Sequence, residues 1–546
     1  MKNGLKLLFI SLLVISSMTV KAQLQEHIDK AKIAYNEYAD IENHNVIKSS
    51  KEVTSYGVGD SRMFWRYNLS VMPPSWIQQS ATCRAVGEHS YIFVADADWG
   101  THMTQEDVDS IYNCLENVTV ANNTMGVVEM CQTYFGTIPD ELDADPKVIF
   151  YYSALGSYAG SVFDGYFSPF NQMTDAEAQG SGEHSNECEM LYMSCDPVNP
   201  LAPVTLAVMA HELEHLIHFG HDSNEESWVD EGCAEFAMVL FGVPDPIMDF
   251  QQEPNNNLMT WNQDYSDYVK TMLFFTYISE QTTGPDFITQ IVANPLNGVI
   301  GLEDCLTTIS FPLDFQQIFS NWTLANFIND NTFGTGMYGY DALDLPAFTT
   351  EQYFTSYPAT TSNTLNDCAA HYYRLNTTFS SLDISMNYDI GGEWDINLLV
   401  FENSVIKEVI PFVDNALTFD FPLDYTISKL ILVVTNKELG TSSKPYDISI
   451  NNISGITDIS GKNEEFSIYP NPATNYATIN YVSGNVSSIE FKLLDVLGQE
   501  VDVQSIGNIS DGNYTLTLST EELLSGIYFV LLNNGSSILR KKLVVQ

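Results

Sequence analysis

Four of the ten histidines in this chain lie between residues 205 and 237, in a segment that is also rich in acidic residues. His211 and His215 are four residues apart, so on one helix their imidazoles project from the same face, one turn apart. At this spacing two imidazole nitrogens can reach one zinc ion at about 2.0–2.1 Å. Glu212 follows the first histidine, where its carboxylate can accept a proton from a metal-activated water. The pattern His-Glu-x-x-His therefore predicts a catalytic zinc site.

Two residues compete to be the third protein ligand, and His221 is the first of them. It fits the metzincin pattern H-E-x-x-H-x-x-G-x-x-H, except that His218 stands where this pattern needs a glycine. A residue with a side chain resists the positive φ of such a turn, and no convincing Met-turn follows. A metzincin-type site that uses His221 therefore stays an alternative. His218 is interpreted as a packing residue or, at most, as a residue beside the site.

Glu231 is the second candidate, and it lies on a further expected helix. Residues Ser223 to Glu226 have the form of a capping box, which predicts that this helix begins there. A helix packed against the histidine helix can deliver one carboxylate to the zinc without a glycine hinge. Glu235, one turn beyond Glu231, can accept the free N–H of a ligand histidine and fix its tautomer. The expected metal ligands are His211, His215, Glu231 and a water molecule.

The second helix also carries a family resemblance. Trp228, Glu231, Gly232, Ala234 and Glu235 match the pattern W-x-x-E-G-x-A-E that follows H-E-x-x-H in the gluzincin clan of zinc peptidases. Within that clan the segment most resembles immune-inhibitor-A-like and hyicolysin-like secreted peptidases. The resemblance covers residues 59–355 and is strongest at 185–240. In those families an asparagine more often stands at the place of Asp230.

The resemblance implies a secreted zinc endopeptidase that acts on polypeptides, with Glu212 as the general base. Gluzincins often stabilise the oxyanion with a downstream tyrosine or histidine, for which Tyr268 is the candidate and Tyr265 a rival. The segment Cys188–Met193 is expected to be a strand before the histidine helix, either an edge strand that pairs with an extended substrate or a purely structural one.

A second class of function remains open, namely a surface adhesion or binding protein whose metal site is structural or inactive. Glu212 argues against it, because a purely structural zinc has no use for a carboxylate at that position. Structural zinc sites also generally fill the fourth position with protein.

The composition of the chain excludes some partners. Lysine and arginine number 22 against 70 aspartates and glutamates, which gives a net charge of −48. Such a surface repels nucleic acid and anionic lipid. It is compatible with weak binding of Ca²⁺, although the sequence has no clear EF-hand-type loop. The eight cysteines are permitted to form disulfides in an exported protein, and Cys233 is interpreted as a core residue that faces away from the metal.

The start of the chain predicts export. Residues 1–22 combine a basic start, a short apolar run and Val20-Lys21-Ala22, which indicates a signal peptide that is cleaved after Ala22. No later segment is long and apolar enough to be a membrane span, so we expect a mature protein without a transmembrane segment.

Several domains are expected, because 546 residues are too many for one. The pattern of elements predicts a multidomain fold: an α+β zincin-like catalytic domain, a β-sandwich and an all-β C-terminal domain. The expected divisions are a leader or short propeptide (23–58), the catalytic domain (59–355), the sandwich (365–452), a linker (453–463) and the C-terminal domain (464–546).

The C-terminal domain carries a second resemblance. Its motifs, in order, are Tyr469-Pro470-Asn471-Pro472-Ala473, Leu494-Asp495-Val496-Leu497-Gly498-Gln499, Gly526-Ile527-Tyr528 and Lys541-Lys542-Leu543-Val544-Val545. They resemble the C-terminal sorting domain of the type IX secretion system. The resemblance implies that the partner is the type IX secretion machinery. It also implies passage through the outer membrane of a Bacteroidetes-type bacterium, to a secreted or cell-surface location.

Overall fold

The structure, a computed structural model, describes the chain from residue 55 to residue 546. The gaps in this range are residues 72–73, 141, 159–160, 379–380, 389–391, 414, 422–425, 453–465, 484–487, 497–498, 508–511 and 534–537. The expected signal peptide, the leader up to residue 54 and the linker therefore lie outside the described residues.

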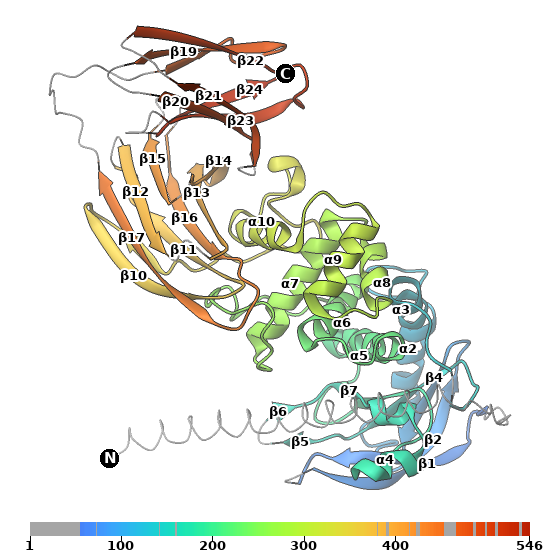
Figure 1. Cartoon of the computed structure of the whole chain (residues 1–546). Coiled ribbons are helices and arrows are strands. Elements are labelled where there is room, and N and C mark those ends of the chain that lie inside the picture. Colours follow the sequence, from blue (N-terminus) through green and yellow to red (C-terminus); the bar gives the residue numbers. More distant parts are fainter. Residues whose placement is uncertain are drawn as a thin grey trace, which may run out of the picture. The chain divides into compact units, whose positions relative to one another are not determined.

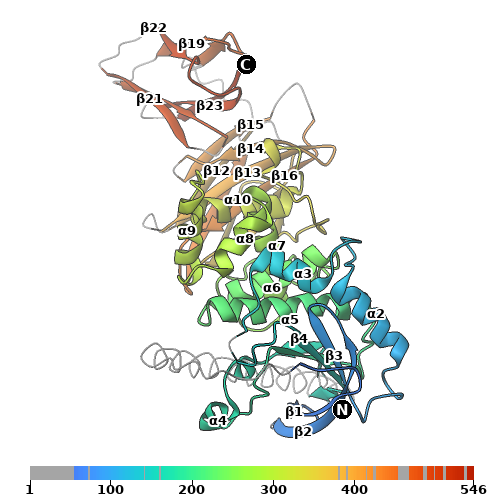
Figure 2. The same ribbon diagram turned by 90° about the vertical axis from the view of Figure 1, so that its right-hand side faces the viewer.

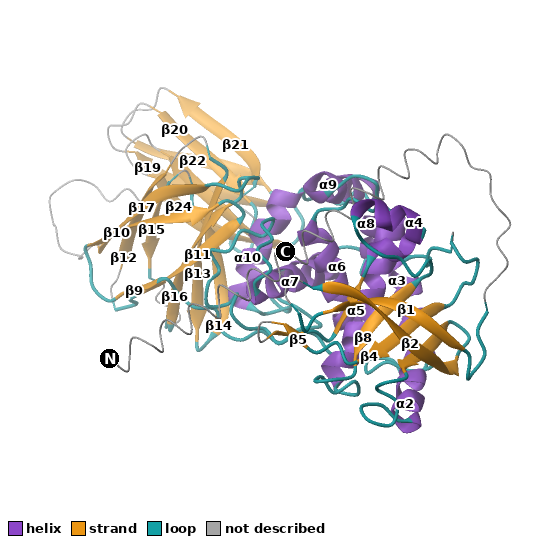
Figure 3. Ribbon diagram, turned by 90° about the horizontal axis from the view of Figure 1, so that it is seen from below, coloured by secondary structure: helices purple, strands orange, loops and turns teal. Residues whose placement is uncertain are grey.

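The chain folds into two compact units. The first comprises the chain up to residue 253 with 258–322 and 340–346, and the second comprises 254–257, 323–339 and 347–546. Together they combine helices and sheets in several domains and end in an all-β region, in agreement with the coarse fold prediction. In Figure 3 the helices (purple) gather in one part of the chain, and the second part consists mainly of strands (orange).

The first unit is built on one mixed sheet of six strands in the order β1-β2-β3-β4-β8-β7. The strands are β1 (Ser61–Asn68), β2 (Ser75–Val86), β3 (Ser90–Ala95), β4 (Val148–Ser153), β7 (Gly165–Phe167) and β8 (Met190–Ser194). Strands β3, β4 and β8 are parallel, whereas β7 runs antiparallel to β8 at the edge. A separate pair is formed by β5 (Ser157–Tyr158) and β6 (Ser161–Val162). Every residue of β3, β4 and β8 is buried, as expected for the inner strands of a covered sheet.

Helices complete this unit (Figure 1). They are α2 (Gln105–Glu116), α3 (Val127–Phe135), α4 (Asp175–Ala178), α5 (Pro203–His221), α6 (Ser227–Phe241), α7 (Tyr265–Gln281), α8 (Pro285–Val292), α9 (Gly298–Thr308) and α10 (Phe315–Ile328), the last of which ends in the second unit. Its short 3₁₀ turns are η1 (Pro169–Gln172) and η2 (Gln179–Ser181), whereas η3 (Gly334–Gly336) belongs to the second unit. Helix α5 lies beside α6, which in turn lies beside α7 (Figure 2).

The start of α6 differs from the prediction. The helix begins at Ser227 with Glu226 at the cap position, and no side chain caps it, so the capping box expected at Ser223 is wrong. Both glutamates of that segment have other partners. Glu225 accepts the backbone N–H of Gly298 at 2.8 Å, and Glu226 accepts the indole N–H of Trp228 at 2.7 Å. Glu225 and Gly298 are 73 positions apart, so this contact could not be foreseen from the local sequence.

The second unit contains two sheets that share one core. Their orders are β10-β17-β12-β15 and β14-β13-β16-β11-β9. The strands are β9 (Gln352–Phe354), β10 (Ala359–Asn366), β11 (Ala369–Leu375), β12 (Ser381–Tyr388), β13 (Trp394–Glu402), β14 (Val405–Pro411), β15 (Ala416–Asp420), β16 (Lys429–Asn436) and β17 (Ser443–Asn452). Leu432 of one sheet and Ile448 of the other are fully buried in the same cluster, which makes this a β-sandwich.

The C-terminal part consists only of strands among its described residues. A three-stranded sheet has the order β18-β19-β22 and a four-stranded sheet the order β21-β20-β23-β24. The strands are β18 (Phe466–Tyr469), β19 (Tyr476–Ser483), β20 (Ser488–Leu494), β21 (Glu500–Gly507), β22 (Gly512–Ser519), β23 (Gly526–Asn533) and β24 (Ile538–Val545). Apolar residues of both sheets form one core.

All eight cysteines are free thiols and all are buried, so the disulfides that the sequence permits are not formed. Within the described part of the chain, no helix has the length and apolar character that crossing a membrane requires.

Gly232 allows α6 to pack closely on α7, because a Cβ at this position would overlap the ring of Phe275. We expect Gly232→Ala to destabilise the first unit by about 1–3 kcal/mol, the usual result of overpacking a core. Urea unfolding, followed by tryptophan fluorescence, should show a lower midpoint. The matched control is Gly180→Ala, where a Cβ meets nothing within 4 Å. Equal midpoints for the two variants would contradict the proposed role of Gly232.

Candidate metal centre

Three side chains from two helices converge in the first unit. His211 and His215 come from α5, and their Nε2 atoms lie 3.1 Å apart. Glu231 comes from α6, and its Oε2 lies 3.5 Å from Nε2 of His211 and 3.6 Å from Nε2 of His215. A tetrahedral zinc ion with bonds of about 2.0–2.1 Å holds its ligand atoms roughly 3.3 Å apart. The three atoms therefore fit the ligand set of one zinc ion.

The other ring nitrogens face carboxylates. Nδ1 of His211 lies 3.3 Å from Oε1 of Glu235, and Nδ1 of His215 lies 3.1 Å from Oδ1 of Asp230. An ionised carboxylate only accepts hydrogen bonds, so when both carboxylates are ionised each Nδ1 carries a proton, and a neutral ring then presents the lone pair of Nε2 to the other ring. Two such lone pairs at 3.1 Å repel each other unless a proton or a metal ion lies between them.

The protonation of these groups follows from their contacts. Burial raises the pKa of Glu231, but hydrogen bonds from His211 and His215 outweigh it and lower the pKa to about 2. Burial lowers the pKa of His211, but Glu231 and Glu235 outweigh it and raise the pKa to about 10. Without a metal ion, the cluster therefore binds protons at the positions where the metal ion would lie. Zinc must displace these protons, so its affinity increases with pH.

Glu212 lies beside the three ligands and points to the sheet. Its Oε2 accepts the backbone N–H of Phe167, in the edge strand β7, at 2.7 Å. Burial raises the pKa of Glu212, and the two neighbouring histidines oppose the rise. This hydrogen bond fixes the position of the Glu212 carboxylate. The partner expected from the sequence is a different one, a water molecule bound to the metal.

A cavity of about 430 Å³ opens onto the cluster. Its lining includes His211, Glu212, His215, Glu231, Tyr265 and Tyr268. Burial, followed by the negative charges of Glu231 and Glu235, raises the pKa of Tyr268, so its hydroxyl keeps its proton. The hydroxyl of Tyr265 donates to the backbone oxygen of Pro246 at 2.9 Å.

The remaining histidines of the segment are not brought to this point. His218 is fully buried, with Nδ1 3.2 Å from Oε1 of Glu214 and 3.6 Å from Oδ1 of Asp230. His221 ends α5, and its Nε2 lies 3.1 Å from the backbone oxygen of Thr137. Cys233 is also fully buried, in a group with Glu214 and His218 and not with the three convergent ligands.

On the substrate side, the structure excludes one of the two roles left open for the strand before the histidine helix. The strand expected at Cys188–Met193 is β8 (Met190–Ser194), and it is not an edge strand, because it lies between β4 and β7. The edge next to the site is β7, three residues long and lining the cavity. A strand of three residues has too little periodicity to be recognised in a sequence.

Asp230 is the second feature that sequence reasoning did not assign. It was noted only as a departure from the family pattern, but its carboxylate holds His215 in place as Glu235 holds His211. Its position directly before Glu231 on the same helix was the available signal.

Comparisons with known proteins identify the C-terminal part. Residues 467–546 match the family described as the secretion system C-terminal sorting domain. The sequence matches none of the curated proteins.

Two solved structures illustrate the structural matches. Dimeric latent PorU from Porphyromonas gingivalis is 13% identical, with 37% of this chain and 21% of that chain covered and a TM-score of 0.14. β-Glucuronidase 3 from Bacteroides uniformis is 11% identical, with 32% of this chain and 26% of that chain covered and a TM-score of 0.11. The chain thus spans only about a fifth to a quarter of their length, and such partial likenesses assign neither a fold nor an activity.

The family match, together with the all-β fold of the same residues, confirms the prediction for the end of the chain. Residues 467–546 are a type IX secretion C-terminal sorting domain, which directs the protein to the type IX secretion machinery and through the outer membrane of a Bacteroidetes-type bacterium.

Proposed function

We propose that the protein is a secreted zinc endopeptidase of the gluzincin type, with a zincin-like catalytic domain in the first unit. One observation carries the proposal. Nε2 of His211, Nε2 of His215 and Oε2 of Glu231 converge at 3.1–3.6 Å while carboxylates behind both rings fix the tautomer that zinc requires.

The residues around the ligands suit peptide hydrolysis. Zinc bound here supplies a Lewis acid that polarises a carbonyl group and makes water more acidic. Glu212 accepts the proton of the attacking water and later transfers it to the leaving amine. Burial raises the pKa of Glu212, and this favours both proton uptake and proton release near neutral pH. Its backbone partner Phe167 keeps the carboxylate in position.

The surroundings support a polypeptide substrate. Strand β7 forms the edge of the sheet and lines the cavity, so an extended peptide can add to it through backbone hydrogen bonds. Tyr268 is the proposed donor to the oxyanion, since it lines the same cavity and keeps its proton. Tyr265 is the weaker candidate, because its hydroxyl already donates to Pro246.

The first test replaces the general base. Glu212→Gln should lower the rate of casein hydrolysis by about 10²–10⁴-fold, because the amide cannot accept the proton of water. Bound zinc, measured by elemental analysis, should stay at the wild-type level since the three ligands are intact. The matched control is Glu129→Gln, an exposed glutamate in the first turn of α3, which should retain full activity. A wild-type protein that binds zinc and hydrolyses no protein substrate would favour the adhesion or binding protein.

The second test distinguishes the two possible third ligands. Glu231→Ala should abolish stable zinc binding at this site and lower the zinc content by one equivalent, because it removes one of three convergent ligands, whereas His221→Ala should retain zinc and activity. The measurement is the zinc content after dialysis. The opposite result would establish the metzincin-type site and exclude the gluzincin assignment.

The third test concerns the carboxylate behind His215. Asp230→Asn should reduce zinc affinity by about 10–100-fold, the usual effect of removing a carboxylate that orients a ligand histidine. Competition with a chelator of known affinity measures the change. The comparison variant is Asp109→Asn, on the exposed face of α2, which should bind zinc as the wild type does. Equal affinities for the two variants would exclude an orienting role for Asp230.

A further inference from the structure

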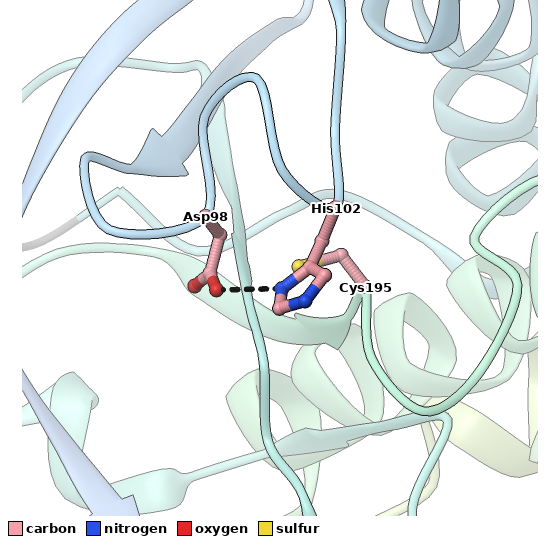
Figure 4. Close-up of side chains that lie close together, drawn as sticks. All are labelled: Asp98, His102 and Cys195. Atoms are coloured by element: carbon pink, nitrogen blue, oxygen red, sulfur yellow. Dashed lines mark hydrogen bonds and ion pairs between the residues drawn. The ribbon is translucent and has the colours of Figure 1, made fainter.

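A second group of side chains of the types that bind metal ions lies at the ends of the parallel strands in the first unit. Asp98 comes from the loop after β3, and Cys195 directly follows β8. His102 stands four residues beyond Asp98 in the same loop. Because β3, β4 and β8 are parallel, their carboxyl ends meet at one edge of the sheet, and the loops that follow them bring these three side chains together (Figure 4).

The ligand atoms of this group are close together and partly held in place. One carboxylate oxygen of Asp98, one ring nitrogen of His102 and the sulfur of Cys195 lie within 4.8 Å of one another. Oδ1 of Asp98 lies 3.0 Å from Nδ1 of His102. The other oxygen of Asp98 accepts the backbone N–H of Ala154, just after β4, at 3.0 Å. The Asp98 carboxylate is thus fixed toward the histidine and the thiol.

The group is surrounded by negatively charged side chains, and one side of it is buried. Asp98 and Cys195 are each only 5% exposed, whereas the side chain of His102 is 33% exposed. Oδ1 of Asp196, at the rim, lies 4.0 Å from Nε2 of His102. Burial, followed by the charges of Asp98 and Asp196, raises the pKa of the Cys195 thiol. A cation would offset the repulsion among these groups, and the exposed edge of His102 leaves a path for it.

We propose that Asp98, His102 and Cys195 bind a second zinc ion, at a site separate from the one formed by α5 and α6. On binding, the thiol and Nδ1 of His102 lose their protons to solvent, and the cation takes the place of the proton between Nδ1 and Asp98. The separation of 3.0 Å between those two atoms is close to the roughly 3.3 Å between ligands of tetrahedral zinc. A thiolate ligand selects zinc over calcium or magnesium. Water or Asp196 completes the coordination.

A catalytic thiol is the main alternative for a Cys-His-Asp group, and the structure argues against it. Reactive cysteines are partly exposed and lie in electropositive surroundings that lower the pKa of the thiol. Cys195 is buried, lies beside two aspartates, and has a raised pKa. The role of the site is therefore structural: a cation would join the loops that follow β3 and β8.

Cobalt(II) substitution of the full chain tests the proposal. A thiolate on cobalt gives an intense charge-transfer band in the near ultraviolet, and the site of His211, His215 and Glu231 contains no sulfur. The wild type should therefore show the band upon cobalt titration, and Cys195→Ala should lose it. Cys83→Ala, at another buried cysteine, should retain it. Glu231→Ala should also retain it, so the outcome is independent of the proposed peptidase site.

A second variant covers the case in which Cys195→Ala does not fold. His102→Ala changes a partly exposed side chain. The affinity for cobalt, measured by titration of this band, should fall by at least about tenfold. The proposal is overturned if the wild type shows no band, if the band persists in Cys195→Ala, or if His102→Ala binds as the wild type does. It is also overturned if Cys233→Ala removes the band, because the thiolate ligand would then belong to the buried group of Glu214, His218 and Cys233.

Discussion

The site depends on the contact between α5 and α6, which places one carboxylate against two imidazoles that face each other. Two neutral rings would not stay in this arrangement alone, because their lone pairs repel at 3.1 Å. The helix pair imposes it, with Glu235 and Asp230 behind the rings and Glu231 in front of them. The protein thus supplies rigid helices and buried acids, and a bound cation would supply the attraction that makes the arrangement favourable.

The partners of the acidic residues on α5 and α6 explain how so acidic a chain buries carboxylates. Glu212, Glu214 and Glu235 are all at least nine-tenths buried, and isolated buried carboxylates would be costly. Each lies close to a histidine or a backbone N–H: Glu212 bonds to Phe167, Glu214 lies beside His218, and Glu235 lies beside His211. The histidines of α5 therefore have two roles. His211 and His215 face Glu231, and His218 balances the charge of the carboxylates behind them.

The sequence was sufficient to predict which side chains come together where this follows from the geometry of a helix. The i, i+4 spacing of His211 and His215 is a property of one helix, and Glu231 follows from a second helix that packs against the first. The prediction failed where a side chain takes a different partner. The expected capping box does not form: its acidic residue, Glu226, accepts the indole N–H of Trp228, and Glu225 accepts the backbone N–H of Gly298, far along the chain. Which strand forms the edge stayed open in the sequence, because the order β4-β8-β7 depends on pairing between segments, not on the pattern within any one of them.

The free thiols connect the export of the chain with its chemistry. An exported protein meets oxidising conditions, in which accessible thiolates form disulfides. Burial raises the pKa of Cys83 to about 11 and those of Cys114, Cys188 and Cys368 to about 12, so very little thiolate is present to react. Cys195 shares this protection but also has a histidine and a carboxylate within ligand distance. A bound metal would protect it further, since a coordinated thiolate is less available for oxidation than one that forms transiently. Only a cysteine that has not formed a disulfide can bind a metal ion, so the reduced state of Cys195 is compatible with a role as a metal ligand.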